Sequence, residues 1–245
     1  NYGVITSIGK AHIGEFGSYE AIKNTKAELY QWLANHQGTT FINEDLDVLN
    51  EMIQKTSAEK IINYGTKSNF QYSYQYIDSN PFVNFYLKDK IVKTQLPGEY
   101  NFSNFITACT IGQYFEVPID KIISVLSSYQ SDNNRSQILH KDGLTLIMDA
   151  YNANPSSMES ALTNLKNMES PKKGAILGHM LELGEYSLQE HQSIVQLAES
   201  LKLDFLILVG NEFKNSSKSS NTLWFKDSTD AKEWWKQQEL KNYLV

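Results

Sequence analysis

The chain has 245 residues, of which 41% are hydrophobic and 20% charged, and its formal net charge is -6. These values exclude a disordered tail, a collagen-like chain and a coiled-coil rod, and the acidic balance weighs against a general nucleic-acid binder. No apolar run approaches the roughly 18 residues that a membrane-spanning helix needs, which predicts a protein without membrane insertion. The one cysteine, Cys109, cannot form a disulfide within the chain and suits a reducing, cytoplasmic compartment.

The first half of the chain predicts strands and helices in alternation. A helix is indicated over residues 18–33, because Ile22, Leu29 and Leu33 recur at helical spacing and Ser18 is a suitable N-cap residue. Further strands are expected at 3–8, 39–43 and 60–64, and further helices at 45–54 and 119–129. The chain starts in a strand-like run without an initiator methionine or a signal peptide, so we expect it to be a piece of a longer protein.

Two stretches of the first half have a distinct texture. Residues 70–95 alternate aromatic and polar side chains and contain turn signals at 79–81 and 88–90, which predicts antiparallel strands with one solvated face. Residues 100–115 are apolar on nearly every side, which predicts a buried helix.

The second half begins after residues 130–134, which contain no apolar side chain and form the best candidate for a linker. Beyond them, strands alternate with amphipathic helices, a pattern typical of a parallel, doubly wound sheet. The expected strands are 144–148, 174–177, 205–209 and 222–225, and the expected helices begin at Pro155, Ser187 and Ser228. We therefore predict two α/β domains, residues 1–132 and 133–245.

General catalytic templates do not match this sequence. There is no G-x-G-x-x-G string, no zinc-type cysteine and histidine spacing and no G-x-S-x-G string. Gly9 and Gly14 have the spacing of a P-loop, but Glu15 and Phe16 replace the residues that would bind phosphate and magnesium. Generic patterns thus predict only a two-domain α/β protein that binds a ligand at strand ends or between domains.

Six strings carry a more specific signal. They are ITSIGKAHIGEFGS (5–18), NTKAELY (24–30), LPGEYNFSN (96–104), NNRSQ (133–137), DAYNANPSSM (149–158) and LGHMLELGEYS (177–187). In sequence and order they resemble motifs of the Mur ligase family, and they span almost the whole chain. The resemblance implies that residues 1–132 are the second half of a central ATPase domain whose P-loop precedes Asn1. It also implies that residues 133–245 are a Rossmann-like C-terminal domain, truncated at its end.

The resemblance further implies an activity. The expected protein is a monomeric, ATP-dependent amide ligase of cytoplasmic peptidoglycan synthesis, which uses ATP and Mg2+ to join D-alanyl-D-alanine to UDP-N-acetylmuramoyl-tripeptide through an acyl phosphate. The chain alone is expected to be inactive because it would lack the P-loop. Two alternatives stay open: a sibling ligase that adds another amino acid, such as another Mur ligase or a folylpolyglutamate-synthase-like enzyme, and a non-catalytic nucleotide-binding module.

Two residues are expected at a magnesium site. His12 follows a strand end, where a loop side chain can meet a metal ion, although a lone histidine is more often structural. Lys26 is predicted on the apolar stripe of its helix, where it either extends its ammonium to water or becomes reactive through burial. By resemblance, His12 coordinates magnesium, and Lys26 is catalytic and carbamylated, which turns it into an anion that binds the metal.

Three further residues are expected at the nucleotide. Asn101 and Asn104 lie at i and i+3 near the start of a helix, where asparagine is suited to capping, whereas by resemblance the pair faces the adenine. Arg135, the only arginine of the chain, stands in the polar linker, and its guanidinium suits phosphate oxygens. By resemblance, Arg135 reaches the terminal phosphate and takes part in catalysis.

The string that starts at Asp149 completes the expected nucleotide site. Asp149 ends a predicted strand, where doubly wound sheets bind ligands, and its alternative role is to cap a turn. By resemblance, Asp149 hydrogen-bonds the ribose hydroxyls, and Tyr151, Asn152 and Asn154 line the same edge. One departure concerns His179, which occupies a position where the family usually has aspartate. Either it retunes the site or it is lineage variation.

Overall fold

The computed structural model describes residues 1–216 and 219–245, which form two compact units. Unit 1 comprises Asn1–Gly9 and Phe16–Gln130, and unit 2 comprises Lys10–Glu15 and Ser131–Val245. The short segment Lys10–Glu15 therefore belongs to unit 2, although the chain on both of its sides belongs to unit 1. Among the described residues, no helix combines the length and the apolar character needed to cross a membrane.

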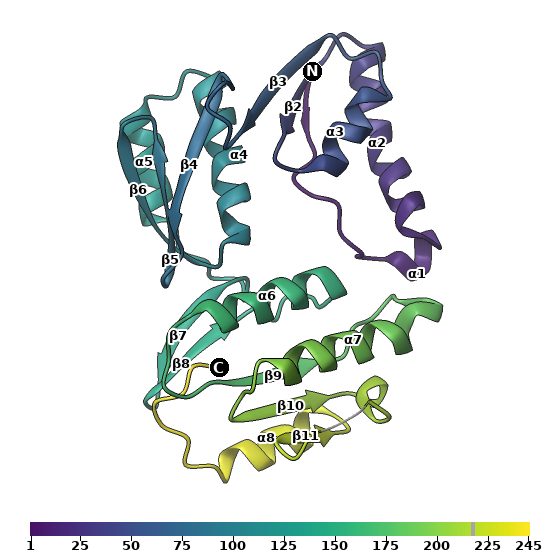
Figure 1. The fold of residues 1–245 in the computed structure, drawn as a ribbon, viewed down its shortest axis with the longest axis vertical. Helices are drawn as coiled ribbons and strands as arrows, with labels where there is room; N and C mark the ends of the chain where they lie inside the picture. The colour runs from purple at the N-terminus through teal and green to yellow at the C-terminus, as the bar shows by residue number, and fades with distance from the viewer. Residues whose placement is uncertain (217–218) are drawn as a thin grey trace. The chain divides into compact units, whose positions relative to one another are not determined.

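Unit 1 is built on a mixed sheet whose six strands lie in chain order (Figure 1). They are β1 Tyr2–Val4, β2 Thr39–Asn43, β3 Lys60–Gly65, β4 Tyr72–Asp78, β5 Phe82–Leu87 and β6 Lys90–Pro97. Strands β1 to β4 are parallel, whereas β4, β5 and β6 form an antiparallel meander, which confirms the prediction made for residues 70–95. The first strand is shorter than the expected 3–8, because its ladder with β2 ends at Val4.

Helices cover both faces of this sheet. They are α2 Tyr19–Asn35, α3 Asp47–Gln54, α4 Tyr100–Tyr114 and α5 Ile119–Ser128, and a short helix α1, Ile13–Phe16, precedes them. Helices α2 and α3 contact β2, while α4 contacts β2 to β5 and α5 contacts β6. Because successive side chains of a strand point to opposite faces, Phe41 joins the core under α4 and Ile42 joins the core under α2 and α3.

Helix α4 confirms the prediction of a buried helix. Two tyrosines of the sheet hydrogen-bond to it: Tyr64 through Thr107 Oγ1 (2.7 Å) and Tyr74 through Thr110 Oγ1 (2.8 Å). Burial raises the pKa of Tyr64 to about 12, so this phenol stays protonated. Burial also raises the pKa of the Cys109 thiol to about 12, which keeps the thiol unreactive at neutral pH.

Helix α2 begins as predicted but buries a different set of residues. Ser18 Oγ caps the helix by accepting a backbone N–H bond (3.1 Å). The buried residues are Ile22, Tyr30 and Leu33, whereas Lys26 is exposed. Of the two alternatives stated for Lys26, its exposure matches the one in which the ammonium extends to water. A lysine beside an apolar stripe extends its ammonium to water, because burying an unpaired cation is costly.

In the part of residues 131–245 that the structure describes, unit 2 contains five strands and three α-helices. The strands are β7 Gln137–Lys141, β8 Leu144–Met148, β9 Gly174–Gly178, β10 Phe205–Val209 and β11 Thr222–Phe225. The helices are α6 Pro155–Asn167, α7 Ser187–Ser200 and α8 Ser228–Lys236, and the short 3-10 helices are η1 Gly184–Tyr186 and η2 Asn211–Phe213. Strands β9, β10 and β11 are parallel in the order β11-β10-β9, with α6 and α7 on one side and α8 on the other (Figure 1). This arrangement confirms the predicted Rossmann-like α/β fold.

Strand β7 was not predicted from the sequence. It pairs antiparallel with β8 through a two-residue turn, Asp142-Gly143, in which both residues have positive φ. Such an Asp-Gly pair between two strand-like runs is a strong hairpin signal, so the sequence contained the information.

The last three residues join the two parts of the unit 2 sheet. Leu244 forms parallel bridges to Thr145 in β8 and to Lys173, which precedes β9, and it is 4% exposed. Thr145 N–H donates to Tyr243 O (2.9 Å), and Gly174 N–H donates to Leu244 O (2.9 Å). The strand order is therefore β7-β8-(243–245)-β9-β10-β11, with only β7 antiparallel to the rest.

Replacing Leu244 should test this join. We expect Leu244→Ala to lower the free energy of unfolding of unit 2 by about 2–5 kcal/mol, as large-to-small changes in cores do. Leu223→Ala is the matched control: Leu223 lies in β11 but is 36% exposed, and we expect a loss below about 1 kcal/mol. Urea unfolding followed by circular dichroism measures both. Equal losses would show that residues 243–245 do not join the sheet.

Candidate functional site

The carboxyl ends of the parallel strands of unit 2 meet at one edge of the sheet. Strand β8 ends just before Asp149, β9 ends just before His179, and β10 ends just before Gly210. Ligands of doubly wound sheets bind at this edge, because helix N-termini and variable loops gather there. The candidate site is therefore built from the residues that follow these three strands.

Arg135 and Tyr151 meet at the end of β8. The register of the hairpin places Gln137 opposite Met148, so the residues before β7 lie beside those after β8. Ala150 N–H donates to Asn134 O (2.8 Å), and the Arg135 guanidinium lies 3.9 Å from the centre of the Tyr151 ring. Stacking uses the face of the guanidinium and leaves its in-plane N–H groups for an anion.

Asn154 and Asn152 are engaged in local hydrogen bonds at the start of α6. Asn154 is the N-cap: its Oδ1 accepts from Ser157 N–H (3.0 Å), and Ser157 Oγ accepts from Asn154 N–H (3.1 Å). Pro155 occupies the first helical turn, where its missing N–H costs nothing. Asn152 Oδ1 accepts from Ala153 N–H (2.9 Å). The capping role explains Asn154 without a ligand.

The remaining predicted residues of the nucleotide site lie in unit 1. Asn101 is buried, and its Nδ2 donates to Pro97 O (2.8 Å). Its Oδ1 accepts from Nδ2 of Asn104 (3.2 Å), whose side chain is exposed at the surface of α4. Asn101 thus orients the amide of Asn104. Lys26 also lies in unit 1, whereas His12, Arg135, Asp149, Tyr151 and Asn154 belong to unit 2.

His12 faces two glutamates of unit 2. Its Nδ1 lies 2.6 Å from Glu182 Oε2 and 3.6 Å from Glu15 Oε2, and the three donor atoms all lie within 4.8 Å of one another. One imidazole nitrogen and two carboxylates are a donor set that fits a divalent cation. His12 and Glu182 both adopt the left-handed backbone conformation, with φ of 60° and 62°. The sequence reasoning found His12 but missed both glutamates as its neighbours, although Glu15 and Glu182 lie within the six strings.

His179 packs tightly at the end of β9. Its Nδ1 lies 3.5 Å from Glu212 Oε2, and the imidazole covers Gly210 so closely that a Cβ there would lie 2.1 Å from Nδ1. Gly210 also has a φ of 124°, which disfavours any other residue. This edge of the sheet is therefore shaped around the imidazole of His179.

His191, on α7, was not singled out in the sequence. It is fully buried; its Nδ1–H donates to Ser187 O (2.7 Å), and its Nε2 accepts from Met180 N–H (3.0 Å). These two bonds fix one neutral tautomer, and burial lowers the pKa of His191 below its usual value. Because Met180 precedes Glu182 by two residues, His191 supports the loop that faces His12.

The neutral state of His191 predicts a pH dependence of stability. The unfolded chain binds a proton at His191 more readily than the folded chain, so the free energy of unfolding should fall as pH drops through about 6.5. One proton contributes a slope of at most about 1.4 kcal/mol per pH unit. We expect His191→Gln to lose this slope and His140→Gln, at an exposed histidine of β7, to keep it. Urea unfolding at pH 5, 6 and 7 gives the comparison, and identical slopes in both variants would contradict it.

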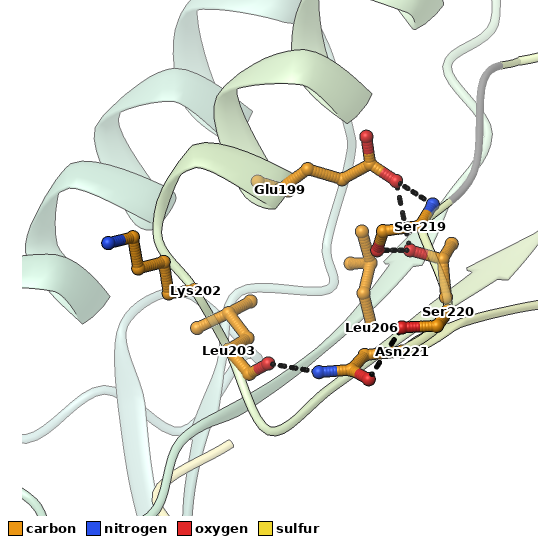
Figure 2. Close-up of a pocket in the computed structure, with 9 residues that line it drawn as sticks. Glu199, Lys202, Leu203, Leu206, Ser219, Ser220 and Asn221 are labelled. Carbon is orange, nitrogen blue, oxygen red and sulfur yellow. Dashed lines mark hydrogen bonds between the residues drawn. The ribbon is translucent and has the colours of Figure 1, made fainter.

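Unit 2 also contains a hollow at the other end of its strands (Figure 2). Its volume is about 230 Å³, and it lies where β10 and β11 begin, beside Leu206 and Thr222. Glu199 accepts from Ser219 N–H (2.5 Å) and from Thr222 Oγ1 (3.1 Å), so its carboxylate is already engaged. None of the predicted site residues lines this hollow.

Fold and site together define a two-unit α/β protein with a candidate anion-binding edge. Residues 1–112 match the Mur ligase middle domain, and residues 134–235 match the glutamate ligase domain of Mur ligases. The chain belongs to the Mur ligase family, as the six strings indicated.

Individual relatives agree with this assignment. The chain is 31% identical over 220 residues to the UDP-N-acetylmuramoyl-tripeptide--D-alanyl-D-alanine ligase of Mycobacterium tuberculosis (strain ATCC 25618 / H37Rv), covering 85% of this chain and 43% of that protein. The enzyme of the same name from Bacillus subtilis (strain 168) is 28% identical, with 84% and 45% covered. The crystal structure of MurF from Acinetobacter baumannii superposes with a TM-score of 0.81 at 25% identity, covering 99% of this chain and 55% of that one. The chain thus spans about half the length of its relatives.

Proposed function

We propose that the protein containing this chain is an ATP-dependent carbon–nitrogen ligase that joins D-alanyl-D-alanine to UDP-N-acetylmuramoyl-tripeptide in cytoplasmic peptidoglycan synthesis. The observation that carries the proposal is the similarity, across most of the chain, to relatives that bear this name. We further propose that it acts as a monomer and that its two domains divide between residues 132 and 133.

The proposed reaction assigns roles to the predicted residues. ATP would transfer its terminal phosphoryl group to the terminal carboxylate of the tripeptide. The amine of D-alanyl-D-alanine would then attack that carbonyl, lose a proton and expel phosphate. Arg135 would bind the terminal phosphate with its in-plane N–H groups, and its exposed, stacked guanidinium suits this role.

Five further residues would form the nucleotide site. Asp149 would accept hydrogen bonds from the ribose hydroxyls, and Tyr151 would line that edge with the aromatic face not used by Arg135. Asn104 would present its exposed amide to the adenine, held in orientation by the buried Asn101. Asn154 would shape the edge by capping α6.

His12 and a carbamylated Lys26 would each be a magnesium ligand, and Glu15 and Glu182 would offer further oxygen donors beside His12. When bound, the ion would neutralise charge that develops on the phosphoryl oxygens. An unmodified lysine ammonium has no free electron pair for a metal, so the role of Lys26 requires the carbamate.

The test is ligation by the protein expressed from the complete reading frame. We expect phosphate release to require both UDP-N-acetylmuramoyl-tripeptide and D-alanyl-D-alanine, with the amide product identified by mass spectrometry. Turnover with a different amine alone would assign a sibling ligase. Binding of ADP without any amine-dependent turnover would assign a nucleotide-binding module. Either result would overturn the proposal.

Lys26 provides a sharper prediction, because its exposed side chain can be removed without disturbing a core. We expect Lys26→Ala to change the free energy of unfolding by less than about 0.5 kcal/mol. We expect its kcat to fall by about 100-fold or more, because an anion close to a cation is worth several kcal/mol. Formate or acetate should partly restore the rate by filling the vacated space.

Lys23→Ala is the control for this change. Lys23 lies on the same helix and pairs with Glu20 (2.8 Å) and Glu51 (3.5 Å), so its replacement removes a lysine of α2 without touching the proposed site. We expect it to keep kcat within about threefold of the starting enzyme, less than the tenfold that 1.4 kcal/mol would give. Wild-type activity in Lys26→Ala would remove Lys26 from the mechanism.

A further inference from the structure

We propose that Glu190 and His191, adjacent residues on α7, are positioning residues that hold the segment Lys10–Glu15 on unit 2 and thereby fix His12 against Glu182. The segment needs such a device because Gly9 and Phe16 on either side belong to unit 1. Within unit 2 it is therefore held by non-covalent contacts alone. The structural part of this proposal is independent of the ligase assignment, whereas its consequence for catalysis rests on the proposed function.

Glu190 holds the start of the segment through an ion pair. Its Oε1 lies 2.6 Å from Lys10 Nζ, and its side chain is only 11% exposed, compared with 43% for Lys10. No other ion-pair partner of Glu190 is found in the part of the chain that the structure describes. Detachment of the segment would leave a mostly buried carboxylate without its cation, which is strongly unfavourable. Lys10 N–H also donates to Ser156 Oγ on α6 (3.2 Å).

His191 holds the surface on which the rest of the segment lies. Its Nε2 fixes Met180 N–H (3.0 Å) at the start of the loop that carries Glu182. Glu182 then makes two contacts to the segment: its backbone O accepts from Gly14 N–H (2.9 Å), and its carboxylate faces His12 Nδ1 (2.6 Å). The position of His12 therefore depends on a loop that His191 anchors.

A close backbone contact completes the fit. A Cβ at Gly14 would lie 2.5 Å from Gly184 N and 2.7 Å from Glu182 O. Those atoms belong to the backbone and cannot move aside as a flexible side chain could. The segment Lys10–Glu15 can therefore pack against the loop of residues 182–184 only because residue 14 has no side chain.

A double-mutant cycle with hydrogen–deuterium exchange tests the ion pair in the chain as it stands. We expect Lys10→Met to increase the exchange of peptides covering 10–16 and 180–186 by about 5- to 30-fold, the population change that 1–2 kcal/mol produces. Adding Glu190→Gln removes the uncompensated charge, so the double variant should exchange no faster than Lys10→Met alone. Additive effects, or a change below about twofold in Lys10→Met, would overturn the role of Glu190.

Lys90→Met is the matched control. Lys90 also pairs with a distant carboxylate, Asp120 (2.5 Å), but in unit 1 and away from the segment. We expect Lys90→Met to leave the exchange of peptides 10–16 and 180–186 unchanged. An increase in these peptides as large as that caused by Lys10→Met would overturn the proposal. If Glu190→Gln fails to fold, Lys10→Met still tests the ion pair, because Lys10 is partly exposed and its replacement leaves the core intact. The exchange of Lys10→Met is then compared with that of the unchanged chain.

Two further variants test His191 and the glycine contact. His191→Phe keeps an aromatic ring but removes the acceptor, so exchange should rise in 180–186 and also in 10–16. A rise confined to 180–186 would overturn the positioning role. Gly14→Ala should increase the hydrogen–deuterium exchange of peptide 10–16. Gly178→Ala should not, because a Cβ at residue 178 meets nothing within 4 Å.

The catalytic consequence is measured separately in the complete protein. We expect Lys10→Met to lower kcat while the KM for ATP stays within about twofold, because His12 is displaced and the residues proposed to bind the nucleotide are not. If the complete protein shows no ligation at all, the proposed function fails while the exchange results still decide the structural role. If ligation occurs and kcat is unaffected by Lys10→Met, the positioning role in catalysis is wrong.

Discussion

The hydrogen bonds of residues 243–245 are the constraint on which the candidate site of unit 2 depends. The hairpin β7–β8 carries Arg135, Asp149 and Tyr151, and β9 carries His179 and Glu182 at its carboxyl end. The sheets β7-β8 and β9-β10-β11 are connected through Leu244, which bridges to Thr145 of β8 and to Lys173 before β9. Backbone groups of residues 243–245 bond to β8 on one side and to the start of β9 on the other, so these bonds also fix the register of the two parts.

The order of elements was predictable because it depends on local periodicity. Residues 39–43 and 205–209 are strands with the expected bounds, and the alternation over 70–95 became an antiparallel meander. Exposure was less predictable, since it depends on what packs against a face. On α2, Lys26 shares the helical face of Ile22 and Leu33. Ile22 and Leu33 are buried, whereas Lys26 is exposed. Strand β7 is harder to predict because it directly follows a polar linker and its burial is low along its whole length.

The site was partly predictable for the same reason. Strand ends and sequence motifs pointed to Arg135, Asp149 and Tyr151, and the structure groups the residues around them at the end of β8. By contrast, Glu182 beside His12 and Glu190 beside Lys10 lie about 170–180 positions further along the chain, and no local pattern links these pairs. Such contacts arise from tertiary packing and require coordinates. Asn154 shows the opposite case, since its capping role follows from the Asn-Pro-x-Ser sequence alone.

The loop and segment around His12 carry strain that other contacts must offset. His12 and Glu182 both have left-handed backbones, which for residues with a side chain costs about 1–3 kcal/mol each. Helix α7 supplies the opposing contacts with two adjacent residues of different character. His191, packed against Phe213 in the interior, acts as a neutral acceptor, whereas Glu190 near the surface acts as a charge. A buried group must be neutral or paired. The fully buried His191 is therefore neutral, and Glu190 is paired with Lys10. Two adjacent residues of α7 thus hold both the segment that carries His12 and the loop that carries Glu182.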